Sequence, residues 1–192
     1  MEPSVKGSVV KVAVDELRAL VEKGRLLEDK LRDRLEPDFA DVVLEEPINI
    51  AAWYPASLYD ALLHIFVDEI HVGEIERLAE GGRHAARKLS DAGFYGQLER
   101  RADGSASAAL IRLVVSLSRA IYNFTTWELG HFEDTDFEIV ITDAAAYPDT
   151  FMWRNVGFIE AATSLATGKD WCVTCERTSP ARIVFHVKPV PA

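Results

Sequence analysis

Cysteine is scarce in this sequence, long apolar runs are missing, and basic residues are outnumbered by acidic ones. Only two cysteines occur among 192 residues. Two thiols three positions apart cannot cross-link a chain of this length, so we expect a reducing, cytoplasmic setting. No apolar run approaches the ~20 residues that a membrane span requires. The formal charge of −10 disfavours binding to the phosphates of nucleic acids.

The last third of the chain predicts two strands, a helix and two more strands. The expected strands are Phe124–Phe132, Phe137–Asp143, Trp171–Glu176 and Arg182–Lys188, and the expected helix is Phe151–Thr167. Apolar and polar residues alternate along these strands, as they do in a sheet that buries one face. We therefore predict a four-stranded antiparallel sheet whose apolar face is covered by helices.

Residues 1–123 are predicted to be mainly helical. One helix runs from Ser57 to about Val72, and the next spans about Glu74–Ala92. The last long helix, Ser105–Tyr122, is apolar around much of its circumference, so we expect it to cover the sheet together with Phe151–Thr167. The other helices are expected to pack outside. The fold class is thus α+β, a helical N-terminal half followed by β-β-α-β-β, and the whole chain is predicted to form one domain.

Two adjacent glycines, Gly81 and Gly82, lie inside the predicted helix Glu74–Ala92. Each glycine in a helix interior costs on the order of 1 kcal/mol relative to alanine. Nothing resembling a strand precedes the pair, so it is not a phosphate-binding loop. We expect the cost to be offset by the close approach of another backbone at Gly82.

Cys172 and Cys175 form a Cys-x-x-Cys motif on a predicted strand. Zinc normally takes four ligands, often from two such pairs, and only His186 on the next strand is a candidate third ligand. Positions three apart in a strand point to opposite faces, so we expect Cys175 to face the core and Cys172 the other side. A redox-active pair would lie at a helix N-terminus. We therefore predict no stoichiometric zinc and no catalytic thiol.

Two other polar groups have alternative interpretations. Asp60, His64, Asp68 and His71 follow one side of a predicted helix and form either a metal or acid–base site or a solvated, ion-paired face. The second interpretation is favoured because a metal needs a further ligand and supporting residues around it. The acidic turn Glu133–Asp136 lacks the spacing of a calcium loop, so a solvated turn is favoured. The predicted site contains no catalytic residue and no metal.

Aromatic residues gather where the helices are expected to meet the sheet. Trp53 and Tyr54 lie on a connector bracketed by Pro47 and Pro55, where they either contact a ligand or plug one end of the core. The candidate ligand-binding residues are Trp53, Tyr54, Phe66, Tyr95, Trp127, Trp153 and Cys175. Small-molecule sites are mostly apolar and aromatic. The leading hypothesis is a non-enzymatic binding or sensory module that holds an apolar small ligand or a partner segment between helices and sheet, without a cofactor.

Two alternatives to a ligand-binding module remain open. One is a protein-interaction or assembly subunit without a ligand, and the other is an enzyme, which would need a cluster of perturbed titratable groups. Val140 and Val184 are predicted on the outer side of the sheet, and two sheet edges need protection. We therefore expect a homodimer. It should be tighter in moderate salt than in dilute buffer, because each chain carries −10 of charge.

Several short motifs resemble a family of paralogous myxobacterial proteins of unknown function. They are Lys6–Val10, Trp53–Pro55, the Gly82-bearing helix leading to Gly93–Tyr95, and the Phe158–Glu160 helix leading to Cys175. The C-terminal half is also similar to the superfamily that contains four-vinyl-reductase-type domains, Golgi transport-particle subunits and haem nitric-oxide-binding domains. This resemblance implies helices packed on an antiparallel sheet, with a small or apolar ligand between them in several members.

The sequence departs from these relatives at the positions that would carry a cofactor. Where four-vinyl-reductase-type domains have a second cysteine before the last strand, this chain has Arg182–Val184, so only Cys175 is matched. The Tyr-x-Ser-x-Arg motif of the haem domains is absent. We therefore expect neither a two-thiol metal site nor haem.

Overall fold

The structure is a computed structural model that describes residues 2–91, 118, 120–133 and 136–191. The chain forms two compact units, one of Met1–Ile75 with Ile121–Phe124 and the other of Glu76–Ala120 with Thr125–Ala192. We call them unit 1 and unit 2. The predicted helix Ser105–Tyr122 lies almost wholly outside the described residues, so its packing on the sheet stays a prediction, as does the single domain.

Unit 1 is mainly helical, as predicted. Its elements are β1 (Ser4–Lys6), α1 (Gly7–Glu22), α2 (Glu28–Arg34), α3 (Pro37–Leu44), β2 (Trp53–Pro55), α4 (Ala56–Ile65) and the π-helix η1 (Phe66–Ile70). The proline-bracketed connector is extended, and its β2 strand pairs antiparallel with β1. The helix predicted from Ser57 is corrected at both ends: it begins at Ala56 without a side-chain cap, and it closes in the π-turn at Ile70.

The core of unit 1 follows the helical spacing of its apolar residues. Val10, Val14 and Leu17 of α1 are buried on one face, and Leu58 and Leu62 of α4 are buried likewise. Residues three or four apart lie on the same side of a helix, so this spacing presents a continuous apolar stripe to the core.

Unit 2 contains the predicted strands and the helix between them. After the 3-10 turn η2 (Ile75–Arg77), its elements are α5 (Leu78–Asp91), β3 (Thr126–Phe132), β4 (Phe137–Thr142), the 3-10 turn η3 (Ala144–Ala146), α8 (Asp149–Thr167), β5 (Trp171–Ser179) and β6 (Arg182–Pro189). The four strands are antiparallel in the order β3-β4-β6-β5. The last strand is therefore inserted between β4 and β5, and the outer strands β3 and β5 form the edges.

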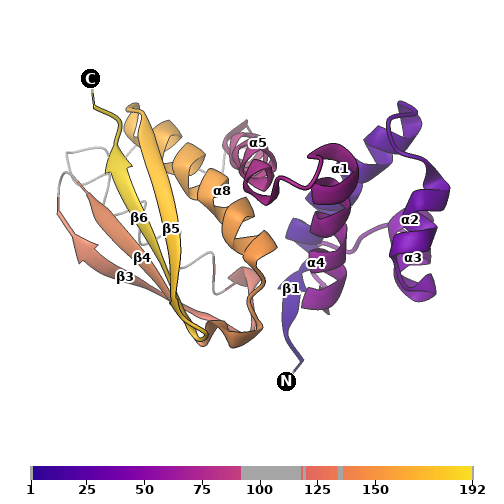
Figure 1. The fold of residues 1–192 in the computed structure, drawn as a ribbon, viewed down its shortest axis with the longest axis horizontal. Helices are drawn as coiled ribbons and strands as arrows, with labels where there is room; N and C mark the ends of the chain where they lie inside the picture. The colour runs from indigo at the N-terminus through magenta and orange to yellow at the C-terminus, as the bar shows by residue number, and fades with distance from the viewer. Residues whose placement is uncertain (1, 92–117, 119, 134–135, 192) are drawn as a thin grey trace. The chain divides into compact units, whose positions relative to one another are not determined.

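The predicted alternation of the strands is confirmed. Phe137, Ile139, Ile141, Phe185 and Val187 are all buried on the same face of the sheet. Helix α8 packs against the sheet, where it lies beside β5 (Figure 1). The sheet thus has one apolar face covered by a helix, which agrees with the predicted α+β architecture.

Helix α5 forms a third layer on the opposite side of α8 from the sheet (Figure 1). A Cβ atom on Gly82 of α5 would overlap the backbone carbonyl oxygen of Arg154 in α8. In the reverse direction, a Cβ atom on Gly157 of α8 would overlap the carbonyl oxygen of Ala79. The predicted close approach of another backbone at Gly82 is therefore confirmed, and the contact is reciprocal.

The outer face of the sheet differs from the prediction. Val140 and Val184 do point to this face, where they pair across β4 and β6, but they are only 7% and 3% exposed in the single chain. They therefore do not form the exposed apolar surface that motivated a homodimer, which stays a prediction without that support. Among the described residues, no helix is long and apolar enough to cross a membrane.

Candidate functional site

The predicted aromatic site is divided between the two units. Trp53, Tyr54 and Phe66 belong to unit 1, whereas Trp127, Trp153 and Cys175 belong to unit 2. Tyr95 lies outside the described residues. Within unit 2, the structure brings Trp127 and Cys175 to the same neighbour, Phe185. Trp127 stacks on Phe185, and Cys175 pairs with it across β5 and β6.

Trp127 lies deep in the helix-covered side of the sheet. Its side chain is 2% exposed, and its ring stacks on Phe185 with centroids 6.1 Å apart and an interplanar angle of 16°. Tyr147 makes an edge contact with the ring of Trp127, with centroids 6.3 Å apart, and packs in turn on Phe151 of α8. The indole Nε1–H donates to the Thr125 hydroxyl at 3.1 Å. These ring contacts run from Trp127 of β3 through Tyr147 to Phe151 of α8, whereas Trp153 of α8 is half-buried.

Trp53 is the most exposed of the described aromatic candidates. It lies on β2 opposite Lys6 of β1, and its side chain is 43% exposed. The Lys6 ammonium lies 4.6 Å from the centre of the indole ring, within the range of a cation–π contact. The hydroxyl of Tyr54 accepts a hydrogen bond from the Asn49 N–H at 3.0 Å, which fixes the connector. Phe66 begins the π-helix η1 and is buried.

The two cysteines face opposite sides of β5, as predicted. Cys172 is exposed and Cys175 is half-buried. Burial raises the pKa of the Cys175 thiol to about 11, and the negative charge of Asp149 adds to the effect. The thiolate is the form that attacks electrophiles and binds metals, so a raised pKa keeps Cys175 unreactive near neutral pH.

We expect iodoacetamide to modify Cys172 well before Cys175 in the folded protein at neutral pH. Burial limits access to Cys175, and its raised pKa leaves little thiolate until the pH approaches about 11. Mass spectrometry of the two residues in Cys172→Ser and Cys175→Ser variants measures each rate separately. Equal rates that persist while circular dichroism reports a folded protein would contradict the burial of Cys175.

The polar row on α4 and η1 is split into separate ion pairs. His64 Nε2 lies 3.7 Å from Asp60 Oδ1, and His64 is exposed. Asp68 instead faces α2, where its Oδ2 accepts a hydrogen bond from Arg34 at 2.7 Å. This arrangement agrees with the predicted ion-paired helix face rather than with a metal site.

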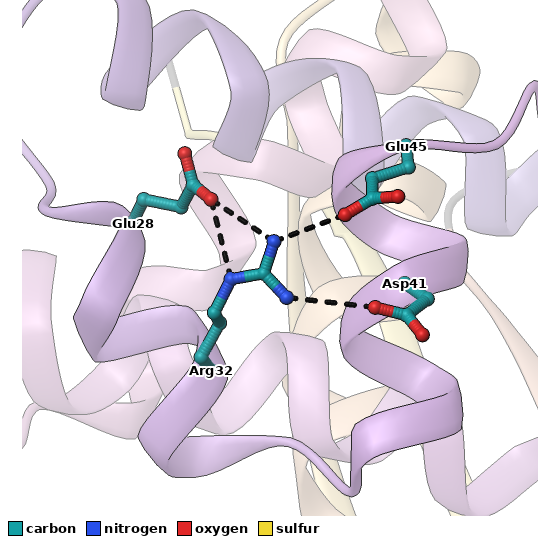
Figure 2. A network of polar contacts seen from close by, with 4 residues as sticks. All are labelled: Glu28, Arg32, Asp41 and Glu45. Atoms are coloured by element: carbon teal, nitrogen blue, oxygen red, sulfur yellow. Dashed lines mark hydrogen bonds and ion pairs between the residues drawn. The ribbon is translucent and has the colours of Figure 1, made fainter.

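Another exposed network joins α2 to α3 (Figure 2). Arg32 contacts Glu28 at 3.1 Å, Asp41 at 3.5 Å and Glu45 at 3.1 Å. Hydrogen bonds to Glu45 and Glu28 raise the pKa of Arg32 above its usual value. The Arg32 guanidinium thus forms ion pairs with three carboxylates on the surface of unit 1. The network therefore links the two short helices α2 and α3.

The structure forms two clusters of histidine and carboxylate side chains on the sheet that were not predicted from the sequence. His131 at the end of β3 lies 3.2 Å from Glu133 and 3.8 Å from Asp136. On β6, the two ring nitrogens of His186 contact Glu138 at 3.1 Å and Glu176 at 3.5 Å. Alternation along the strands could have indicated the His186 cluster. The His131 cluster depends on a register shift in β3 that no local pattern announces.

The described residues define a class of protein by fold. A helical unit built around α1 and α4 accompanies a four-stranded antiparallel sheet, and α8 and α5 form successive layers on that sheet. No protein-family model and no curated protein matches the sequence. The comparison with solved structures, in contrast, finds the same fold.

The similar structures are H-NOX proteins. The Fe(II) unliganded H-NOX protein from K. algicida is 13% identical, with a TM-score of 0.66 and 97% of each chain covered. The H-NOX protein from S. oneidensis in its Fe(II)NO ligation state is 12% identical, with a TM-score of 0.64, covering 97% of this chain and 99% of that chain. An oxygen-binding H-NOX domain related to soluble guanylate cyclases is 13% identical, with a TM-score of 0.60 and coverage of 96% and 94%.

At this level of identity, the likeness concerns the fold. The chain has the fold of H-NOX domains, which confirms the resemblance to haem nitric-oxide-binding domains at that level. The resemblance to a myxobacterial family is not tested by these matches and stays a prediction.

Proposed function

We propose that this chain is a non-enzymatic sensory module that binds an apolar small molecule and does not use haem. The observation that supports a sensory role is the likeness to H-NOX proteins over 97% of both chains. Among those H-NOX proteins, the one related to soluble guanylate cyclases is an oxygen complex, and the S. oneidensis protein is in an Fe(II)NO ligation state. Function does not follow from fold, so the residues of this chain decide which ligand fits.

The side chains present do not fit haem held through an imidazole. Haem iron takes an axial ligand from histidine, cysteine, methionine or tyrosine, and the ligand must reach the iron inside an apolar site. All five histidines lie in the part of the chain that the structure describes, and none of their side chains is buried. Cys172 is exposed, and the raised pKa of Cys175 opposes a thiolate ligand.

The aromatic residues differ in how available they are to an apolar ligand. Trp127 is enclosed by Phe185 and Tyr147, so it supports the core of unit 2. Trp53 keeps much of its ring in contact with solvent while Lys6 holds it on β1 and β2. We therefore assign Trp53, with the neighbouring Tyr54, as the aromatic contact for the ligand in unit 1.

The haem-free proposal predicts that untagged protein incubated with hemin acquires no stoichiometric haem. Absorption spectroscopy in the Soret region measures this, with the K. algicida H-NOX protein as the positive control. Native mass spectrometry of the same sample reports a co-purified small molecule and the oligomeric state together. One haem per chain that is lost on substitution of a single histidine would overturn the proposal. A ligand-free symmetric dimer would instead favour the assembly subunit.

The assignment of Trp53 is tested with anilinonaphthalene sulfonate as an apolar fluorescent probe. We expect Trp53→Ala to weaken probe binding by about tenfold or more, because tryptophan is enriched among the few residues that carry most of the energy of a binding contact. Leu27→Ala is the matched control, since Leu27 is also a large exposed apolar residue of unit 1. Equal binding by wild type, Trp53→Ala and Leu27→Ala would remove Trp53 from the site.

A further inference from the structure

A β-bulge near the end of β3 changes the direction of His131. Leu129 pairs with Ile139 and Phe132 pairs with Phe137, so β3 advances by three residues where β4 advances by two. Continued alternation from Leu129 would point residue 131 to the helix-covered face. Because of the extra residue, Phe132 points to that face instead, and its ring centroid lies 6.4 Å from that of Phe137. His131 is left exposed at the hairpin end, and bulges of this kind commonly re-aim a side chain.

Three metal-ligating side chains converge at this hairpin end. His131 Nε2 lies 3.2 Å from Glu133 Oε1 and 3.8 Å from Asp136 Oδ1. One ligand atom from each of the three residues lies within 4.8 Å of the other two. The Glu133 N–H donates to the Asp136 carbonyl at 2.8 Å, and this bond holds the two acidic residues at a fixed separation.

One oxygen of Asp136 is buried without a hydrogen bond. The side chain as a whole is 37% exposed, but Oδ1 has essentially no contact with solvent and accepts no hydrogen bond. A buried carboxylate oxygen without a donor or cation costs free energy, so such atoms are rare without a reason. This same oxygen is the one that faces His131 Nε2. A cation between the three side chains would satisfy it.

We propose that His131, Glu133 and Asp136 bind a divalent transition-metal ion of the zinc, cobalt or nickel type. An imidazole nitrogen with two carboxylates suits these ions, whereas calcium prefers six to eight oxygen ligands. Three protein ligands leave further coordination positions open to water, as in exchangeable rather than closed structural sites. The site is separate from the apolar ligand of the proposed function and departs from the expectation that the chain has no metal site.

His186 supplies a matched control on the same sheet. It too has two carboxylate neighbours, but Glu138 lies at Nδ1 and Glu176 lies at Nε2. The two carboxylates are therefore on opposite edges of the ring and do not converge on one nitrogen. If the cation bound to any histidine near acidic residues, replacing either histidine would weaken its affinity. Binding at the proposed site should be weakened only when His131 is replaced.

The test is isothermal titration of Zn²⁺ into untagged, chelator-treated protein, in a Cys172→Ser/Cys175→Ser background that removes the thiols. Titration with Co²⁺, followed by its visible absorption, reports the ligand environment independently. We expect one ion per chain. His131→Ala and Asp136→Asn should each weaken the affinity by at least about tenfold, because loss of even an outer-shell partner has an effect of that size. His186→Ala should bind as the parent protein does.

Several results would overturn the site. They are the absence of saturable binding by the parent protein, unchanged affinity in both His131→Ala and Asp136→Asn, or an equal loss in His186→Ala. His131 and Glu133 are exposed, so their substitution should leave the fold intact, which circular dichroism checks. Glu133→Gln keeps the proposal testable if Asp136→Asn does not fold, and it should also weaken binding.

Discussion

Trp127→Ala is expected to lower the free energy of unfolding by about 3–5 kcal/mol, the usual range for removing a buried tryptophan. Trp127 is 2% exposed and is enclosed by Phe185 and Tyr147. The truncation leaves a cavity between α8 and the sheet, and it also leaves the Thr125 hydroxyl without its indole donor. Rigid backbone on both sides limits how far this cavity can collapse.

Urea unfolding followed by circular dichroism measures the effect of Trp127→Ala. Trp153→Ala is the matched control, because Trp153 lies on α8 in the same unit but is half-buried. We expect the control to cost clearly less than Trp127→Ala. A loss of stability that is equal in the two variants would show that Trp127 is not the central residue of this core.

Gly82→Leu is expected to destabilise the protein by roughly 1–3 kcal/mol, the usual cost of overpacking a filled contact. Leucine is the better helix former by nearly 1 kcal/mol, so propensity alone predicts the opposite sign. The packing decides, because a Cβ at this position would overlap backbone atoms of Arg154 in α8. A backbone carbonyl cannot move aside without shifting the whole helix, so even Gly82→Ala should destabilise.

Gly81→Ala is the matched control for the contact between α5 and α8. A Cβ on Gly81 would meet the guanidinium end of Arg154 rather than backbone, and a side-chain end moves at lower cost. We expect Gly81→Ala to cost less than Gly82→Ala in urea melts. A neutral or stabilised Gly82→Leu would mean that α5 and α8 do not approach each other at this glycine.

The sequence by itself determined the strands and the helix of the last third. Alternation is a local property of a strand that buries one face, so it can be read without knowledge of the partners. The cost of a glycine inside a helix is also local, and it correctly indicated a backbone contact at Gly82. The opposite orientations of Cys172 and Cys175 follow from the same period of two.

The tertiary structure alone decided which surfaces meet. The order β3-β4-β6-β5 places β6 beside β4, and no local pattern distinguishes this order from a simple meander. It also decided that Val140 and Val184 are buried on the outer face, that Trp127 is enclosed, and that Trp53 is exposed. Burial depends on neighbours that are distant in the sequence, so the residue type alone does not distinguish an apolar residue in the core from one at the surface.

The bulge in β3 is the clearest case of this division. Residue types predicted an acidic turn at Glu133–Asp136, but its relation to His131 depends on one unpaired residue between Leu129 and Phe132. Register is chosen by which apolar side chains fit together across β3 and β4, and Phe132 gains contact with Phe137 when the strand is shifted. The sequence alone supplied His131, Glu133 and Asp136, and the pairing of two strands brought them close together.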